Sequence, residues 1–240
     1  MRHAWAIRSM QDDALPAHPR IATRQMLRSG LPVVSAGALP PGWTIRRAEP
    51  AQAGALAAMH LATMPDDLLP RLGLSLLATH FWPRLLRSPY SDTWVLLDNG
   101  QHLAGFCVMA RSRMPFRLSF YSDAGFCLQM LLRLLTQPRV LLHAMTVLAA
   151  PLRLQRPIDE VRAELVLLAV RDGCRGQGVG RGLLQHALQA LGAQACLVKT
   201  ASEDARRFYQ RAGFVSCGRE LRNHRSLHLL VRRRSPLPTA

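Results

Sequence analysis

The chain has 240 residues, 49% of them hydrophobic, which is enough to bury one good core and to fold by itself. Its formal net charge is +16, and Lys199 is the only lysine among 31 basic residues. A basic surface attracts nucleic acid, anionic lipid and phosphorylated cofactors alike, so charge alone selects none of them. No apolar run reaches the roughly 18 residues that a membrane span needs, which excludes an integral membrane protein by this test.

Cysteine and histidine usage predicts neither a disulfide framework nor a metal site. The five cysteines are odd in number and form no C-x-x-C pair, which fits a reducing compartment, the cytoplasm. The histidines give one close pair, His224 and His228, in a predicted hairpin without a third ligand. We therefore expect surface histidines there and no bound metal.

The first 42 residues are predicted to form a flexible tail. They mix Arg, Pro, Gly and Ser with little periodicity and end in Leu39-Pro40-Pro41-Gly42, a turn and linker signature. Residues 20–28 are basic and acid-free, as some organelle presequences are, but the order of a signal peptide is absent. We expect one domain over residues 43–235 and a short tail over 236–240.

The domain is predicted to begin with a strand and two helices. Residues 43–48 alternate as a strand does, and Pro50 leads into an Ala-rich helix over 51–63. A second helix is expected over 72–86, because its apolar residues recur at helical spacing.

A hairpin and an insertion follow. Two apolar, β-rich segments, 93–97 and 103–110, flank Asp98-Asn99-Gly100 and predict antiparallel strands. From residue 112 to 157 the pattern changes to apolar helices, expected over 126–135 and 140–148 and separated at Pro138. We interpret residues 112–157 as a helical insertion.

The last third of the chain alternates strands and helices. Residues 163–170 are continuously apolar after Glu164, as in a strand buried on both faces, so we expect them at the centre of the sheet. A Gly-rich loop comes next. The elements predicted after it are a helix over 178–191, a strand over 195–200, a helix starting at Ser202, and strands over 214–218 and 226–232.

The Gly-rich loop carries the clearest chemical signal. Gly176, Gly178 and Gly180 lack a Cβ, so the backbone can turn tightly and bring N–H groups close to a phosphate oxygen. The helix N-terminus adds partial positive charge, and Arg175 and Arg181 can add full charges. The loop therefore predicts an anion site, although glycines that only make a tight turn would give the same pattern.

Two other nucleotide-binding loops fit this segment poorly. A P-loop requires Gly-Lys-Ser/Thr, and no lysine lies near. A dinucleotide fingerprint, G-x-G-x-x-G, has the wrong spacing and comes too late in the chain.

The loop and the helix after it resemble a known family. Arg175 to Gly180 reads R-x-x-G-x-G after an apolar strand and resembles the coenzyme A motif of the GNAT N-acetyltransferase superfamily. Residues 202–214 are similar to that family's N-x-x-A-x-x-F-Y-x-x-x-G-F, with Ser202 in place of Asn. The resemblance implies an α/β (α+β) GNAT fold. Its mixed central sheet would have about six or seven strands, two of them parallel and splayed, with about four flanking helices besides the insertion.

The resemblance also implies acetyl-CoA as cosubstrate and no metal. Backbone groups of Leu168, Ala169 and Val170 would pair with the pantetheine arm, between the splayed strands 163–170 and 195–200. Ser202 keeps a helix cap, while its contact with the cofactor is open because the family uses Asn. The pyrophosphate would lie on Arg175, Gly176, Gln177, Gly178, Val179 and Gly180.

Two residues are candidates for proton transfer. The acceptor amine must lose a proton before it attacks the thioester, and Glu164 occupies the position of the catalytic glutamate in the histone-acetylating branch of the family. The alternatives are an ion pair of Glu164 with Arg162 or another arginine, and a water chain as the base. Tyr209 matches the family's general acid, and its place on an apolar helix face suits a core aromatic equally. Cys174 is expected to be structural.

The acceptor is the least determined part of the reaction. Residues 64–73 and the insertion resemble a bacterial GNAT group with cell-envelope polysaccharide functions, which points to a small molecule with a primary amine, an amino sugar. The alternatives are a protein amino group, a non-catalytic acyl-CoA-binding module, and a nucleic-acid binder, which has no aromatic or recognition-helix pattern behind it. Residues 124–150 suit either packing over the acceptor site or contact with the inner face of a membrane. A monomer or a homodimer is expected.

Overall fold

A seven-stranded mixed sheet forms the centre of the fold, in the strand order β1-β2-β3-β4-β5-β7-β6. The computed structural model describes residues 39–233 except 66, 114, 117–118, 120–122, 137–160, 193 and 223–224. All neighbouring strands are antiparallel except β4 and β5, which are parallel. The strands are β1 (Thr44–Arg47), β2 (Ser91–Leu97), β3 (Leu103–Ala110), β4 (Ala163–Val170), β5 (Cys196–Thr200), β6 (Val215–Arg222) and β7 (Arg225–Arg232).

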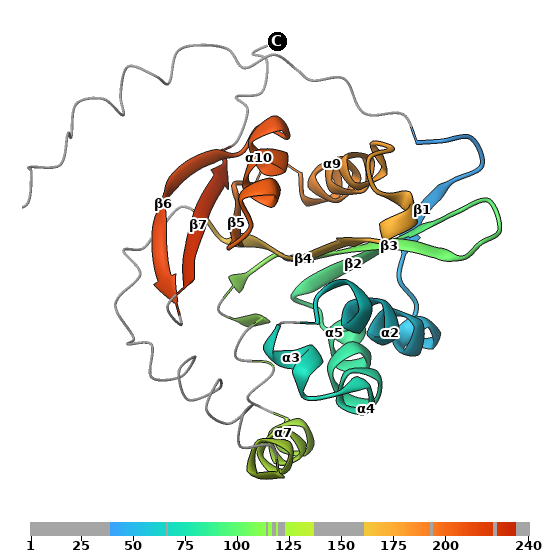
Figure 1. The fold of residues 1–240 in the computed structure, drawn as a ribbon, viewed down its shortest axis with the longest axis vertical. Coiled ribbons are helices and arrows are strands. Elements are labelled where there is room, and N and C mark those ends of the chain that lie inside the picture. Colours follow the sequence, from blue (N-terminus) through green and yellow to red (C-terminus); the bar gives the residue numbers. More distant parts are fainter. Residues whose placement is uncertain are drawn as a thin grey trace, which may run out of the picture. The chain divides into compact units, whose positions relative to one another are not determined.

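Helices cover both faces of this sheet (Figure 1). On one face lie α9 (Val179–Leu191) and α10 (Glu203–Arg211), whose apolar side chains share a buried cluster with alternate residues of β3 and β4. On the other face, α2 (Ala53–Thr63) and α5 (Trp82–Arg87) share a second cluster with Phe106 and Val108 of β3. Because successive side chains of a strand point to opposite faces of the sheet, β3 contributes residues to both clusters. The expected central position of residues 163–170 is confirmed.

The helix expected over 72–86 is interrupted. A short α3 (Leu68–Arg71) ends before Gly73, whose φ of 102° is open to glycine but costly for other residues. The chain then continues as α4 (Leu74–Leu76), the π-helical turn η2 (Leu77–Phe81) and α5. Pro83 has no N–H to donate to the carbonyl of Thr79, and its ring pushes that carbonyl away. This explains the wider π-helical turn.

The other sequence expectations largely hold. The hairpin of β2 and β3 turns at Asp98, whose Oδ1 accepts from the N–H groups of Gly100 and His102. The 3₁₀ turn η1 (Pro50–Gln52) precedes α2, and β6 extends further than the predicted strand, to Arg222. Within the predicted insertion, α7 (Ala124–Thr136) confirms the first expected helix. The second, over 140–148, lies outside the described residues. None of the helices in the described part is long and apolar enough to span a membrane.

Candidate active site

The two parallel strands separate part of the way along their length. They pair at three positions, Ala163 with Cys196, Glu164 with Leu197 and Leu165 with Val198. Beyond this point the described part of β4 pairs only with β3, and the end of β5 pairs with β7. The register of β3 against β4 also shifts there, because Val108 pairs with Leu167 and Met109 with Leu165. A bulge of this kind bends a strand and increases its twist, so it opens the sheet at this point.

This opening leaves one backbone edge of β4 unpaired by β5. Leu168, Ala169 and Val170 pair on their other edge with Cys107, Phe106 and Gly105. A free strand edge offers N–H and C=O groups to any extended ligand that runs alongside it.

The Gly-rich loop forms a tight connection between β4 and α9. It begins with the 3₁₀ turn η3 (Asp172–Cys174), and Gly176 and Gly178 have φ values of 79° and 77°. Within 4 Å of a Cβ built on either glycine there is no other atom, so the backbone conformation and not crowding selects glycine. At Gly180 an added Cβ would lie only 3.2 Å from the Val170 side chain. Glycine therefore allows α9 to pack close to the strand.

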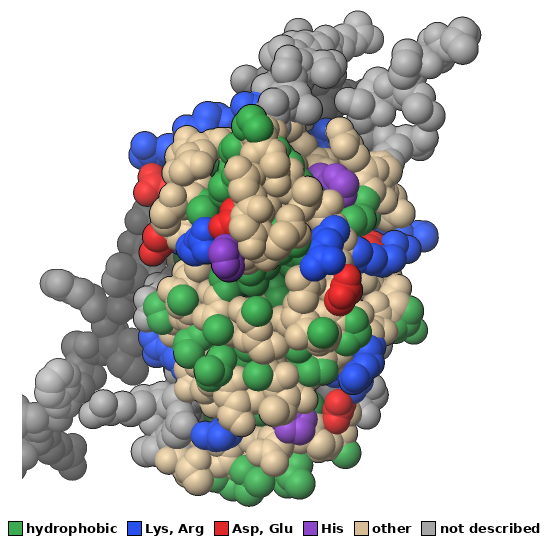
Figure 2. Space-filling model, turned by 90° about the vertical axis from the view of Figure 1, so that its right-hand side faces the viewer, with side chains coloured by type: hydrophobic (Ala, Val, Ile, Leu, Met, Phe, Trp, Pro, Cys, Tyr) green, Lys and Arg blue, Asp and Glu red, His purple; other side chains and the backbone are tan. Residues whose placement is uncertain are grey.

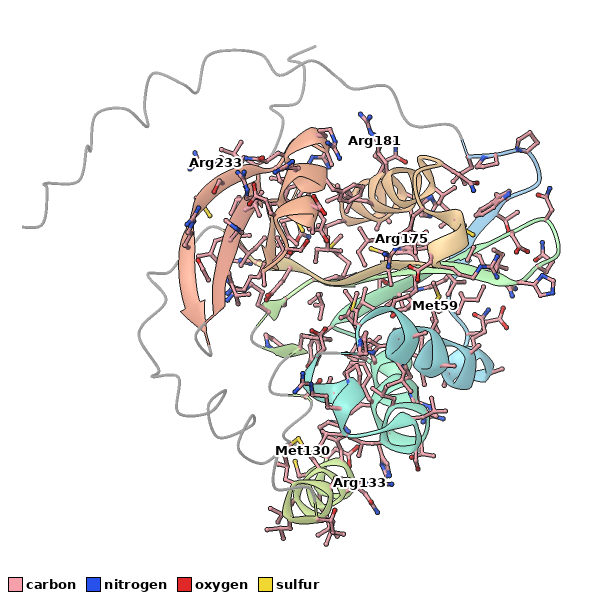
Figure 3. The ribbon with its side chains drawn as sticks, viewed as in Figure 1. Met59, Met130, Arg133, Arg175, Arg181 and Arg233 are labelled. Atoms are coloured by element: carbon pink, nitrogen blue, oxygen red, sulfur yellow. The ribbon has the colours of Figure 1, made fainter. Side chains whose placement is uncertain are left out.

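Two arginines flank this loop at different places. Arg175 donates from Nε to the Val170 carbonyl at 3.2 Å, and its Nη2 lies 2.9 Å from Asp172 Oδ1. Arg181, in the first turn of α9, has buried Nε and Nη2 atoms without a hydrogen-bond partner in the described chain. Figure 3 shows Arg175 beside the end of β4 and Arg181 on the side of α9 that faces away from the sheet. Unpartnered buried guanidinium donors are costly, and an anionic ligand would satisfy them.

Ser202 caps α10. Its hydroxyl oxygen accepts from the Ala205 N–H at 3.3 Å, and its own N–H donates to Thr200 Oγ1 at 3.1 Å. The hydroxyl hydrogen stays available for one more contact, because a serine hydroxyl both donates and accepts. The substitution of Ser for the family's Asn therefore keeps the cap.

Tyr209 is buried on the sheet-facing side of α10, with 7% of its surface exposed. Its ring packs against Phe208 and Phe214 at centroid distances of 5.2 and 5.6 Å. Burial raises the pKa of Tyr209, and the nearby thiols of Cys107 and Cys196 add to the effect. The residue is therefore a protonated phenol at neutral pH, held among core side chains.

Glu164 is paired with Arg113, an arginine that follows β3. Arg113 Nε lies 3.2 Å from Glu164 Oε2, and the two side chains are 18% and 12% exposed. Arg113 also donates its backbone N–H to the Arg162 carbonyl at 3.0 Å. The predicted ion pair thus exists, with a partner 51 residues away in sequence that no local pattern indicated.

The two candidate proton-transfer residues approach β4 from opposite faces. Ala163 and Leu165 share the cluster of α9 that includes Tyr209, so Glu164 between them points to the other face. The bulge and the separation of β4 and β5 begin one residue later. An opening lined from two faces can admit two reactants from two directions.

His228 differs from the sequence expectation. It was expected at the surface, but it is 8% exposed and its Nε2 lies 3.5 Å from Glu203 Oε2. Hydrogen bonding from Arg206 lowers the pKa of Glu203 to about 2, with a further contribution from His228. The reason is the strand order, because β7 lies between β5 and β6 and α10 packs over it. His224 lies outside the described residues.

Three of the cysteines pack in the buried cluster beneath α9. All five are free thiols, and Cys174, Cys107 and Cys196 are buried. Burial raises the pKa of Cys196 to about 12. In the described part of the chain, three or more potential metal ligands do not come together.

Comparison with known proteins agrees with this geometry. Residues 147–216 match the family model of the acetyltransferase (GNAT) domain. The fold is similar to that of a structure described as histone acetyltransferase HPA2 and related acetyltransferase from Corynebacterium glutamicum, at 18% identity and a TM-score of 0.55 over 82% of this chain and 99% of that one. It is also similar to an N-acetyltransferase from Staphylococcus aureus, at 17% identity and a TM-score of 0.53 over 78% and 99% of the chains.

A third similar structure is a spermidine N-acetyltransferase variant from Vibrio cholerae, with 13% identity, a TM-score of 0.51, and 80% and 94% of the chains covered. At these identities the likeness shows the shared fold. Together with the matched segment and the loop, it defines an acyl-CoA-dependent N-acyltransferase. Residues 147–216 therefore carry an acetyltransferase (GNAT) domain match within a chain that has the GNAT-like fold.

Proposed function

We propose that this enzyme transfers an acetyl group from acetyl-CoA to the primary amine of a small acceptor, at the opening between β4 and β5. The observation that carries the proposal is the end of parallel pairing at Leu165 and Val198, directly before the Gly-rich loop. Pantetheine contains two amide groups, and the unpaired edge of Leu168, Ala169 and Val170 can pair with them as a further strand would.

The phosphates of acetyl-CoA would bind at the loop that follows. The pyrophosphate would contact backbone N–H groups of residues 175–180 at the start of α9, where the helix dipole is positive. Arg175 is exposed and can turn from Asp172 to a phosphate. The Nε and Nη2 atoms of Arg181 have no hydrogen-bond partner in the described chain, and they support a second anionic contact on the side of α9 that faces away from the sheet. Ser202 would donate its hydroxyl hydrogen to the pantetheine arm.

Glu164 and Tyr209 would move the protons of the reaction. Glu164 accepts the proton of the acceptor ammonium, directly or through a water, from the face that carries α2 and α5. After the acetyl group has left the sulfur, Tyr209 donates its phenolic proton to the thiolate from the face that carries α10. The raised pKa of Tyr209 keeps the phenol protonated at neutral pH, although it also makes the phenol a weaker acid, because a general acid works best with a pKa near the operating pH.

The acceptor would be an amino sugar of a cell-envelope precursor and not a polyamine. One similar structure is a spermidine N-acetyltransferase, and spermidine carries several positive charges. A chain with a net charge of +16 repels such a cation, whereas an amino sugar linked to phosphate groups would be attracted. Arg113 and Glu164, one cation beside one anion, suit an acceptor that bears both an amine and a negative group.

The catalytic domain would comprise residues 43–235, with the segment 112–157 as the insertion that selects the acceptor. An acceptor on a protein is the competing proposal within the same chemistry. A non-catalytic acyl-CoA-binding module is the competing proposal from another class.

Two measurements test the proposal in order. A thermal-shift titration with acetyl-CoA should stabilise the enzyme by about 3 kcal/mol when the ligand is about a hundredfold above its Kd. Release of free thiol should then be followed with amino-sugar nucleotides, spermidine and peptides as acceptors. Absence of the thermal shift would contradict the site itself. A shift without turnover on any amine would support the non-catalytic module, and turnover only on peptides would support the protein acceptor.

A further inference from the structure

Helix α7 is apolar on two opposite faces. The face toward the body of the domain buries Phe126 and Leu134, with Met130 partly buried beside them. The other face carries leucines at helical spacing i, i+3, i+4 and i+7. They are Leu128, Leu131, Leu132 and Leu135, with 56%, 51%, 47% and 63% of their surface exposed.

This second face is a concentrated apolar surface. The described chain has seven exposed large hydrophobic residues, and these four form one stripe on a single helix. Figure 2 shows hydrophobic side chains gathered at the lower end of the molecule, the height at which α7 lies in Figure 1. A contiguous exposed patch of this kind marks an interaction surface, whereas isolated exposed leucines do not.

The charge of the sequence decides between partners. Helix α7 has no Asp or Glu and carries Arg133, and the sequence from residue 137 to residue 158 adds three arginines and no acidic residue. A second copy of the chain would also carry a formal net charge of +16, which disfavours self-association. An anionic lipid surface combines an apolar phase with the complementary charge.

A groove with two arginines and one aspartate lies next to the start of α7. It has a volume of about 330 Å³ and is lined by His80, Arg84 and Arg87 on one side and by Ser119 and Asp123 on the other. Arg84 pairs with Asp123, the residue before α7, at 2.5 Å. Arg87 is exposed at the rim, where a phosphate headgroup can reach it.

We propose that α7 lies in the interface of an anionic phospholipid bilayer, with its four exposed leucines among the upper acyl chains and the groove residues near the headgroups. This inference concerns attachment and does not depend on acetyl transfer. Its consequence for function is that the enzyme works beside a bilayer, where a lipid-linked acceptor would be found.

Flotation of the full chain with vesicles tests the proposal. We expect binding to vesicles of phosphatidylcholine mixed with phosphatidylglycerol, weakened by salt, and little binding to pure phosphatidylcholine. Leu131→Gln/Leu135→Gln should lower the partition coefficient about tenfold or more, because both side chains leave the acyl region. Val215→Gln is the matched control, since Val215 is 59% exposed on β6 and should leave binding unchanged.

Three results would overturn the proposal. One is equal binding of the Leu131→Gln/Leu135→Gln variant and the Val215→Gln control to the anionic vesicles. A second is a large fall in the Tm of the leucine variant without lipid, which would show that the chain itself already covers the stripe. A third is a concentration-dependent dimer in sedimentation velocity that the leucine variant abolishes, which would assign the stripe to a second copy. Arg87→Gln should reduce binding to the anionic vesicles at unchanged Tm.

Discussion

Arg113 Nε and Glu164 Oε2 lie 3.2 Å apart and connect the segment after β3 with the second residue of the central strand. The pair lies one residue before the point where β4 and β5 begin to separate. It therefore connects the segment after β3 to the candidate reaction centre. The same geometry serves a positioned proton acceptor and a structural clamp, and substitutions of the two partners distinguish these roles.

Glu164→Gln should reduce kcat by about 10²- to 10⁴-fold if its carboxylate accepts the amine proton, because the amide cannot take it. Arg113→Gln removes the ion pair but keeps the carboxylate. Both variants should lose similar stability, about 1–3 kcal/mol, measured by urea unfolding, since each breaks the same half-buried ion pair. Equal kcat values for the two variants would assign the pair a structural role only.

Gly178→Val should abolish stabilisation by acetyl-CoA. The φ of 77° is unfavourable for a β-branched residue and should cost about 1–3 kcal/mol in the unfolding free energy. The added side chain would also project into the open space where phosphate is proposed to bind. Gly173→Ala is the control, because a Cβ there meets no atom within 4 Å and its φ lies outside the left-handed region. Thermal shift with and without acetyl-CoA measures both variants, and a normal shift for Gly178→Val would remove this loop from the site.

Tyr209→Phe should retain acetyl-CoA binding and lower kcat about 10²-fold or more. The ring contacts with Phe208 and Phe214 remain, so the Tm should change little. Because the pKa of Tyr209 is raised by burial, its proton should not be lost below about pH 10, and the wild-type rate should show no alkaline decline from this group. Unchanged turnover of the Phe variant would leave Tyr209 as a core aromatic.

His60 should make the fold sensitive to acid. It is 1% exposed, lies among Phe81, Trp82 and Phe106, and neither ring nitrogen has a hydrogen-bond partner in the described chain. Burial lowers the pKa of His60 from 6.5 to about 4. As the pH falls below 6.5 the unfolded chain takes up this proton first, so stability declines from pH 6.5 to about 4, by about 3 kcal/mol in total.

His60→Leu should flatten this part of the pH profile and raise stability at pH 5, because an apolar side chain replaces an unsatisfied polar one. The unfolding free energy at several pH values measures the effect. His102→Gln is the control, since His102 is 76% exposed and its loss should keep the wild-type slope between pH 6.5 and 4. The same slope in His60→Leu would show that another group is responsible.

Much of the local structure was predictable from the chain alone, because it depends on periodicity and turn residues. The hairpin at Asp98, the central strand and the helices α9 and α10 lie where their patterns indicate. The second helix was predicted as continuous, and only the structure shows how Gly73 and Pro83 divide it into α-helical and π-helical turns. Their effects are local, but the spacing of apolar residues does not reveal where the backbone changes from α-helical to π-helical hydrogen bonds.

The resemblance to GNAT acetyltransferases was visible in the sequence, through the loop Arg175 to Gly180 and the segment 202–214, because short-range backbone geometry and one helix face set these positions. Tertiary structure decided which distant residues meet them. The pairing of Glu164 with Arg113, the burial of His228 under α10 and the bonds of Asp92 to Arg47 and Arg111 all join separate strands or segments. Ion pairs between residues far apart in sequence cannot be predicted from the spacing of residue types, because strand order and register bring the two partners together.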